Sequence, residues 1–314
     1  MRTLTATAVL AAAATALTGC GNVSFGTEEE TRSYTAPASV TALKINGRGG
    51  QVEVATSGTS VIKVRERLRW SNDKNKPKVR HVTDNDTLTL SSECATVTLG
   101  GAVCGVSYRV EVPRDMPVSI DSRDGRIVAS GLGGKVKLHS ANGSIRLDDV
   151  RATSLDLSSS DGSIRVSGRA AAASLSSANG SIRARLTGDR LTARSRDGSL
   201  RLSGSVKTAD LDTAHGAVHA TGLTAERLTA RSRDGGITLG FASPPMNVRA
   251  ETAHGSIRLA LPPGGEGYDI DATARNGRER IDPLLRRDSA SPRQITLDTV
   301  DGGISVDAAD QRTW

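Results

Sequence analysis

A turn residue followed by glycine recurs along the chain at an almost constant step. Eight such Asp-Gly, Asn-Gly or His-Gly pairs lie within residues 124–255, and their successive glycines are 18, 19, 18, 18, 18, 19 and 20 residues apart. Looser copies follow at 276–277 and 301–302. A fixed step of this length is typical of a repeat protein, in which each unit stacks on its neighbours.

Aligning the units on the turn residue gives columns of one residue type. Apolar residues fill the columns six and four positions before the turn residue, and the column three positions after it. The alternation within each segment has a period of two, which predicts strands with one buried face. The column two positions before the turn residue holds only Ser or Thr: Ser122, Ser140, Ser159, Ser177, Ser195, Thr213, Ser232 and Thr252.

Each unit therefore contains a strand, a tight turn, a second strand and a more variable corner near a glycine such as Gly168 or Gly204. A single unit cannot bury its apolar side, so equivalent strands of successive units must pair in parallel, about 4.8 Å apart. Glycine after the turn residue is expected to supply a positive φ. Antiparallel hairpins could also use Asp-Gly turns, but they do not require one residue type per column. We predict an all-β fold, a single-stranded parallel β-solenoid (β-helix) with coils of 18–20 residues.

The regular repeats span residues 116–261, and both flanks are irregular. Residues 37–115 contain a polar excursion at 70–86 and are expected to form N-terminal solenoid turns or a cap, because solenoid ends must hide their edges. Residues 262–314 are expected to form irregular C-terminal turns and a cap, closed by the segment ITLDTVDGGISVDA (295–308). Aromatic residues make up only 2% of the chain, which suits a narrow stack of small interior side chains.

The N-terminus has the order of an export signal. Arg2 precedes an apolar, Ala-rich run at 4–17, which is too short to span a membrane. The tetrad Leu17-Thr18-Gly19-Cys20 resembles a lipobox, which implies a lipoprotein signal peptide at 1–19 and lipidation of Cys20. The polar residues 20–36 would then form the lipid-anchored tether. This pattern predicts an extracytoplasmic protein that is lipid-anchored to the cell membrane.

Two further cysteines, Cys94 and Cys104, lie between strand-like segments at 88–92 and 106–112. Outside the cytoplasm, such a pair is expected to form a disulfide, here clipping a hairpin. Two thiols with no nearby His or second Cys pair do not supply the four ligands of a structural zinc site, so no metal is predicted.

These features together resemble a known family. The lipobox, the strand ending in VEVP (110–113) and the stacked units of the form L-x-L-x-S-x-D/N-G-S-I-R-L are similar to the DUF4097 β-strand-repeat adhesins, over roughly residues 40–306. The resemblance implies a parallel β-helix on the cell exterior and a role in adhesion. It brings no catalytic residues.

One outward column is basic. Four positions after the turn residue stand Arg146, Arg165, Arg183, Arg201, His219, Thr238 and Arg258. Neighbouring cations about 5 Å apart repel by roughly 1 kcal/mol in water, which long Arg stems can relieve by splaying. With a formal net charge of +7, this ladder could bind a polyanion such as a teichoic-type polymer or an acidic glycan. The alternative is an ordinary solvated strand face.

The turn column alternates between acidic and uncharged or His side chains: Asp124, Asn142, Asp161, Asn179, Asp197, His215, Asp234 and His254. We interpret this alternation as a way to avoid stacking like charges, not as a binding site. Hydroxyls of the inward Ser column are expected to satisfy one another.

Enzyme classes find little support. Carboxylates of the turn column lie two rungs apart, about 9.6 Å, at the far limit for an inverting hydrolase. His215 and His254 are also two rungs apart, too far to share one metal ion. Single-stranded nucleic acids require aromatic stacking platforms, and this chain has seven aromatic residues.

We therefore predict a non-enzymatic cell-surface module without a cofactor, held at the membrane by its lipid. Its expected partner is an anionic cell-envelope polymer or another surface protein, bound through the ladder of Arg146, Arg165, Arg183, Arg201 and Arg258. The alternative is a structural spacer or scaffold of the cell envelope. A polysaccharide-acting enzyme is a third hypothesis.

Overall fold

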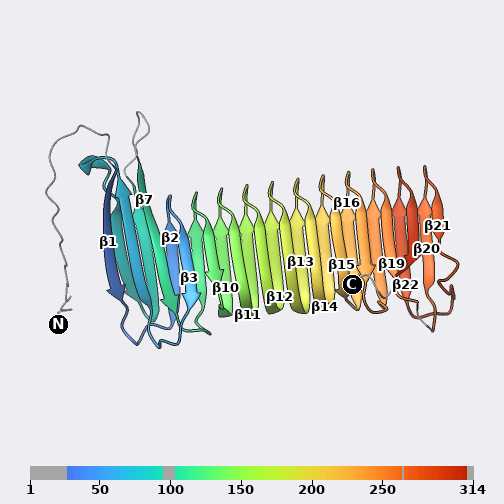
Figure 1. The fold of residues 1–314 in the computed structure, drawn as a ribbon, viewed down its shortest axis with the longest axis horizontal. Helices are drawn as coiled ribbons and strands as arrows, with labels where there is room; N and C mark the ends of the chain where they lie inside the picture. Colours follow the sequence, from blue (N-terminus) through green and yellow to red (C-terminus); the bar gives the residue numbers. More distant parts are fainter. Residues whose placement is uncertain (1–26, 95–102, 264, 310–314) are drawn as a thin grey trace.

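The computed structural model describes residues 27–94, 103–263 and 265–309. These residues form 23 strands and one short 3-10 helix, arranged as a long stack of flattened coils (Figure 1). In each regular coil one strand leads to a tight turn and a second strand leads away from it. We call the two long sides of the stack the before-turn face and the after-turn face. The predicted parallel β-solenoid is confirmed.

On either side of the turns the regular coils pair residue for residue with their neighbours, and register shifts occur at the second corner. Ile182, for example, lies opposite Ile164 in the preceding coil and Leu200 in the following coil. Strands β11–β14 are 14 or 15 residues long because each passes without a break through the second corner into the next coil. The strands of this part are β8 (Val118–Ser122), β9 (Ile127–Ser130), β10 (Gly133–Ser140), β11 (Ile145–Ser159), β12 (Ile164–Ser177), β13 (Ile182–Ser195), β14 (Leu200–Thr213), β15 (Val218–Thr224), β16 (Arg227–Ser232), β17 (Ile237–Phe241), β18 (Asn247–Thr252) and β19 (Ile257–Leu261).

The core is a set of aliphatic columns between the two faces. Leu157 and Leu175 from the before-turn face and Ile164 and Ile182 from the after-turn face are all buried. Burial alternates on either side of the turns in the regular coils, as the period of two predicts. Because each coil contributes only a thin layer, Leu, Ile, Val and Ala fill the interior with few aromatic rings.

The turn glycines are required for a reason that differs from the sequence prediction. None of the eight turn glycines of the regular coils has a positive φ; positive φ occurs at second-corner glycines such as Gly168 (133°) and Gly204 (116°). A Cβ on Gly198 would instead lie 2.1 Å from the carbonyl oxygen of Gly180 in the coil below. The prediction of positive φ at these turns is therefore wrong, and close stacking of the turns excludes a side chain.

The inward-facing Ser and Thr side chains form hydrogen bonds with the backbone of these turn glycines. Ser159 Oγ donates a hydrogen bond to the Gly143 carbonyl of the preceding coil (3.1 Å) and accepts one from the Gly162 N–H of its own turn (3.0 Å). Ser177 and Ser195 repeat the arrangement. The hydroxyls thus satisfy turn backbone groups and not one another, because the buried turn amides and carbonyls lie closer than the next hydroxyl.

The N-terminal coils are stacked out of sequence order. The coil of β2 and β3 lies between the coil of β6 and β7 and the first regular coil, β8 and β9. Beyond β6 and β7, strands β1, β4 and β5 run antiparallel to their neighbours and close this end. These strands are β1 (Glu28–Thr35), β2 (Ala42–Gly47), β3 (Val52–Thr56), β4 (Lys63–Trp70), β5 (Lys78–Asp84), β6 (Thr87–Glu93) and β7 (Cys104–Val112), with the 3-10 helix η1 at Asp73–Asn75.

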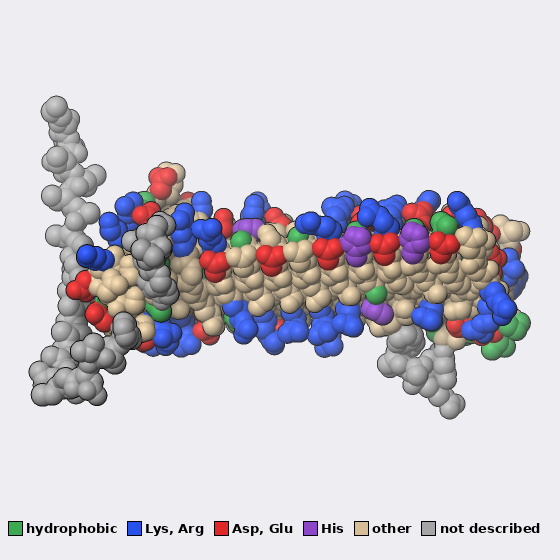
Figure 2. Space-filling view, turned by 90° about the horizontal axis from the view of Figure 1, so that it is seen from above, with side chains coloured by type: hydrophobic (Ala, Val, Ile, Leu, Met, Phe, Trp, Pro, Cys, Tyr) green, Lys and Arg blue, Asp and Glu red, His purple; other side chains and the backbone are tan. Residues whose placement is uncertain are grey.

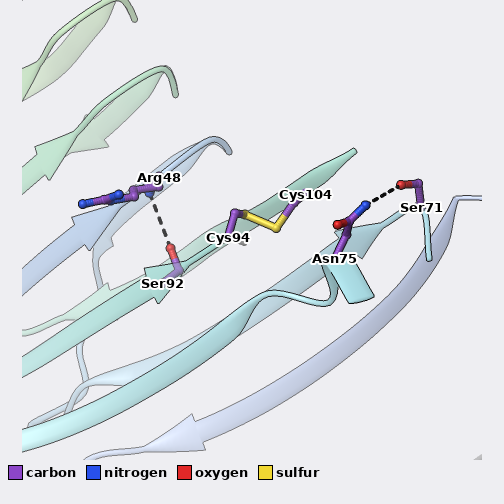
Figure 3. Close-up of a disulfide and its surroundings, with 6 residues drawn as sticks. All are labelled: Arg48, Ser71, Asn75, Ser92, Cys94 and Cys104. Carbon is purple, nitrogen blue, oxygen red and sulfur yellow. Dashed lines mark hydrogen bonds between the residues drawn. A yellow bond between two sulfur atoms is a disulfide. The ribbon is translucent and has the colours of Figure 1, made fainter. Parts of the chain in front are cut away.

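The polar excursion at 70–86 contains η1 and the edge strand β5, which pairs with β6. The disulfide prediction for this region needs one correction. Cys94 and Cys104 are bonded, with Cα atoms 5.9 Å apart (Figure 3). However, β6 and β7 do not pair as a hairpin: β6 pairs with β2 and β5, and β7 pairs with β3 and β4. The disulfide therefore joins the two faces of one coil at its turn side.

The C-terminal coils are also out of order. The coil of β22 (Gln294–Thr299) and β23 (Ile304–Ala308) pairs directly with β18 and β19. Strands β20 (Asp269–Ala274) and β21 (Glu279–Ile281) stack outside it as the last coil. The prediction that residues 295–308 close this end is wrong, since β20 and β21 lie beyond them.

Candidate functional site

The basic column lies on the after-turn face, on strands β11–β14. Arg146 lies opposite Arg165, Arg165 opposite Arg183, and Arg183 opposite Arg201. All four side chains are exposed, because the alternation that buries Ile164 and Ile182 turns the next residue outward. His219 follows opposite Arg201. The parallel register therefore places these cations on adjacent strands about 4.8 Å apart.

The predicted ladder is not uniform in its charge pairing. Arg146 donates a hydrogen bond to Asp148 through Nε (2.6 Å). Arg258 lies apart from the main run, with Thr238 on one side and Ser305 on the other. Within the described parts of the chain, Arg165, Arg183 and Arg201 form no ion pair. Arg258 also has no ion pair within the described residues, but only Arg165, Arg183 and Arg201 lie on adjacent strands.

A groove of about 560 Å³ runs beside these arginines. A further arginine, Arg185, lines it, opposite Ser167 and Ser203 in the neighbouring strands. Arg185 was missed because the other coils hold no arginine in its column. The strand alternation was the available signal, since Arg185 stands two residues after Arg183 and so faces the same side. We call Arg165, Arg183, Arg185 and Arg201, with the hydroxyls beside them, the arginine groove.

The turn column forms a separate, internally satisfied ladder. Figure 2, which looks down on the turns, shows acidic and His side chains in one line along the molecule, with Lys and Arg gathered along both long sides. Asn142 donates a hydrogen bond to Asp124 (2.5 Å). Asp234 accepts hydrogen bonds from His215 (2.5 Å) and His254 (3.1 Å), which belong to its two neighbouring coils. The hydrogen bonds from His215 and His254 lower the pKa of the Asp234 carboxyl. Within this line, Asn or His side chains of adjacent coils therefore serve as hydrogen-bond partners of Asp124, Asp161 and Asp234.

The carboxyl pKa values that depart from their ordinary range belong to Glu30, Asp86 and Asp234, and all three are lowered by hydrogen bonds. Within the described ranges, no three His, Cys, Asp or Glu side chains converge as metal ligands do.

The lipidation residue Cys20 lies outside the described residues. In the part of the chain that is described, no helix has the length and apolar character needed to cross a membrane. The Cys94–Cys104 disulfide is far from the arginine groove, at the N-terminal end of the stack.

The repeat pattern matches a family model, Toastrack DUF4097, at residues 40–184, 116–203 and 170–307. The chain belongs to the Toastrack DUF4097 family. The three matches overlap, as a repeat does when its coils can be aligned in more than one register. Together they cover both the regular coils and the strands that stack out of order at either end of this Toastrack protein.

The chain is similar to several solved structures at low sequence identity. A candidate adhesin from Parabacteroides merdae is 13% identical, with a TM-score of 0.51 over 89% of this chain and 96% of its own. A candidate adhesin from Bacteroides fragilis is 15% identical (TM-score 0.43, 74% and 97% covered). A candidate lipid-binding protein from Parabacteroides distasonis is 10% identical (TM-score 0.48, 90% and 97% covered). No curated protein sequence matches this Toastrack chain.

Proposed function

We propose that this Toastrack protein is a non-enzymatic surface module that binds an anionic polymer of the cell envelope along the arginine groove. The observation that carries the proposal is the run of Arg165, Arg183 and Arg201 on adjacent strands, without ion pairs within the described residues, beside the groove. Unpaired cations in a row raise the local concentration of an anionic partner and orient it along the row. Arg also binds carboxylate and phosphate groups through two parallel hydrogen bonds.

A binding role fits the rest of the molecule better than catalysis. Asp124, Asp161 and Asp234 of the turn column are hydrogen-bonded to Asn or His of adjacent coils, which leaves these carboxylates poor candidates for a proton donor. A general acid requires a raised pKa, whereas the shifted carboxyl pKa values of the described chain are lowered. The rigid pairing of every regular coil also supplies a straight track for a long ligand.

We place the protein outside the cytoplasm, anchored by a lipid on Cys20. The apolar run and lipobox support this location, and the Cys94–Cys104 disulfide supports an oxidising compartment. The stack, which extends away from its N-terminal end (Figure 1), would then carry the groove outward from the membrane.

Co-sedimentation with purified cell-wall sacculi tests the proposal. The chain from residue 21 onward contains every residue of the described fold and lacks the lipid site, so it reports binding by the fold alone. We expect sedimentation at low salt that weakens as salt rises, because counterions screen exposed charges. The double variant Arg183→Glu with Arg201→Glu should abolish co-sedimentation. The control variant Arg196→Glu with Arg233→Glu makes the same change of charge at the turn edge and should reduce co-sedimentation far less.

Salt-independent sedimentation, or none at low salt, would contradict binding of a polyanion. In that case the spacer hypothesis, in which the outward columns only keep a stiff rod soluble, accounts for the molecule better.

A further inference from the structure

We propose that the ligand of the arginine groove is a linear acidic glycan that lies along the solenoid axis, with its carboxylates on the arginines and its hydroxyls on a second column. This inference rests on the proposed function and narrows it to one ligand class. The second column comprises Ser203 and Thr221, which line the groove two residues beyond Arg201 and His219. Residues two apart in a strand face the same side about 6.6 Å apart.

The two columns match a ligand that carries anions and hydroxyls together. Cations recur at the strand spacing of about 4.8 Å, which is close to the advance of one sugar residue along an extended chain. Hydroxyls that donate and accept recur beside them, so a sugar repeat could place its carboxylate on an Arg and its ring hydroxyls on Ser203 or Thr221. Arg185 adds a cation to the hydroxyl column itself, opposite Ser203.

An acidic residue, Asp148, lies at the N-terminal end of the groove. Asp148 accepts hydrogen bonds from Arg146 of its own coil (2.6 Å) and from Ser167 of the next coil (3.3 Å), so the first arginine and the first hydroxyl along the groove already have a partner. A ligand would therefore occupy the stretch from Arg165 to Thr221, along strands β12–β15. The length of four coils predicts recognition of an oligosaccharide segment, not of a single sugar.

A lipid surface fits the groove less well. Membrane binding of a folded surface relies on apolar side chains that insert, together with basic residues. Among the described residues, the exposed large apolar side chains are Val82, Val103, Met246 and Leu284, and none of them lines the groove. A concave, hydroxyl-bearing track favours a narrow polymer over a flat bilayer.

Binding titrations with defined polymers test this inference. The chain from residue 21 onward would be titrated with labelled polygalacturonate, an acidic glycan. Poly-glutamate supplies carboxylates without sugar hydroxyls, dextran supplies hydroxyls without charge, and phosphatidylglycerol vesicles supply an anionic lipid surface. We expect polygalacturonate to bind most tightly and dextran not at all.

Two pairs of variants separate charge from hydroxyl recognition. The double variant Arg183→Ser with Arg201→Ser should lower the affinity for polygalacturonate roughly tenfold or more, because hydrogen bonds to charged groups are lost. The matched control, Arg196→Ser with Arg233→Ser, should change the affinity for polygalacturonate much less. The double variant Ser203→Ala with Thr221→Val should lower the affinity for polygalacturonate roughly threefold to tenfold. Its affinity for poly-glutamate should not change. Its control, Ser205→Ala with Thr224→Val, removes exposed hydroxyls outside the groove.

The outcomes distinguish the two proposals. Equal binding of poly-glutamate, tighter binding of vesicles, or an unchanged affinity after loss of the two hydroxyls would overturn the glycan inference while an anion-binding groove stands. Loss of the arginines without effect on any anionic probe would overturn the proposed function as well.

Discussion

At the scale of single residues, the turn glycine and the serine three residues before it act as one unit. The glycine permits neighbouring turns to stack with almost no space between their backbones. The serine hydroxyl then bridges two successive glycines, accepting from one N–H and donating to the carbonyl below. A buried backbone group without a partner costs about 1–3 kcal/mol, so the serine column stabilises every turn of the regular stack.

Gly198→Ala tests the close-packing explanation. Its Cβ would lie 2.1 Å from the Gly180 carbonyl oxygen, so two stacked turns must separate. We expect the free energy of unfolding to fall by about 1–3 kcal/mol, as for other overpacked sites, measured by urea denaturation. Gly58→Ala is the control, because nothing lies within 4 Å of its added Cβ. Equal stability of the two variants would contradict the explanation.

Ser195→Ala tests the hydroxyl bridge. The change removes the bonds to Gly180 O (3.2 Å) and from Gly198 N (3.0 Å) and leaves both backbone groups buried. We expect a loss of about 1–3 kcal/mol in the free energy of unfolding. Ser174→Ala, on the exposed side of the neighbouring strand, should change it by less than about 0.5 kcal/mol. Similar losses in both variants would show that the bridge contributes nothing specific.

At the scale of elements, the stack is organised by columns that cross many strands. The apolar columns hold the two faces together, while the turn column arranges charges along one edge (Figure 2). Asp residues there alternate with Asn or His, and Asp124, Asp161 and Asp234 accept hydrogen bonds from these neighbours. At the N-terminal end, the antiparallel strands β1, β4 and β5 replace this parallel pattern and end the stack.

Asn179→Asp tests the alternation. The new carboxylate would stand between Asp161 and Asp197, with like charges roughly 4–5 Å apart and a repulsion of about 1 kcal/mol per pair in water. We expect lower stability at neutral pH that recovers in high salt, measured by thermal unfolding at several salt concentrations. Ser205→Asp adds the same charge outside the column. A salt dependence shared by both variants would contradict a role for the column.

The edge strand β1 should respond to acid through Glu30. Hydrogen bonds from Arg32 (2.7 Å) and Lys76 (2.8 Å) lower the pKa of Glu30 from 4.5 to about 2. A pKa lowered in the folded state adds stability above the unfolded pKa, and this stability is lost as pH falls from about 4.5 to about 2. The effect is about 1 kcal/mol or less, since the pair is partly exposed.

Hydrogen exchange of β1 between pH 5 and pH 2.5 measures this effect. After correction for the intrinsic pH dependence of exchange, protection should fall with acid in the native chain. Glu30→Gln should flatten the profile, whereas Glu28→Gln should leave it as in the native chain. A native profile that is already flat would exclude the contribution of Glu30.

At the scale of the whole molecule, spatial order and sequence order differ at both ends. Residues 42–56 insert between two later coils, and residues 294–308 insert before residues 269–281. Each coil of a solenoid is stabilised mainly by its neighbours. The last coil in space therefore depends on a segment that follows it in the sequence.

A truncation after residue 293 tests this dependence. It keeps β20 and β21 but removes β22 and β23, which are their pairing partners in the sheet. We expect amides of residues 269–281 to lose their protection from hydrogen exchange, while those of residues 145–213 keep theirs. In a chain that ends at residue 261, the amides of the regular coils should be as well protected as in the chain that ends at residue 293. Persistent protection of 269–281 would contradict the observed strand order.

The sequence by itself determined the regular part of this protein. Apolar alternation, the fixed step and the Gly and Ser columns specify parallel coils, because each rule acts locally and repeats in every unit. The outward direction of Arg165, Arg183 and Arg201 follows from the same alternation. The same alternation directs Arg185, two residues after Arg183, to that side.

Only the tertiary structure decided the features that depend on which strands meet. The out-of-order coils and the bond across one coil between Cys94 and Cys104 both depend on contacts between separate segments. So does the role of the turn glycines, whose constraint comes from the carbonyl of another coil and not from their own φ. A repeat pattern fixes the shape of each coil, but the stacking partner at an irregular end is chosen by burial and edge protection.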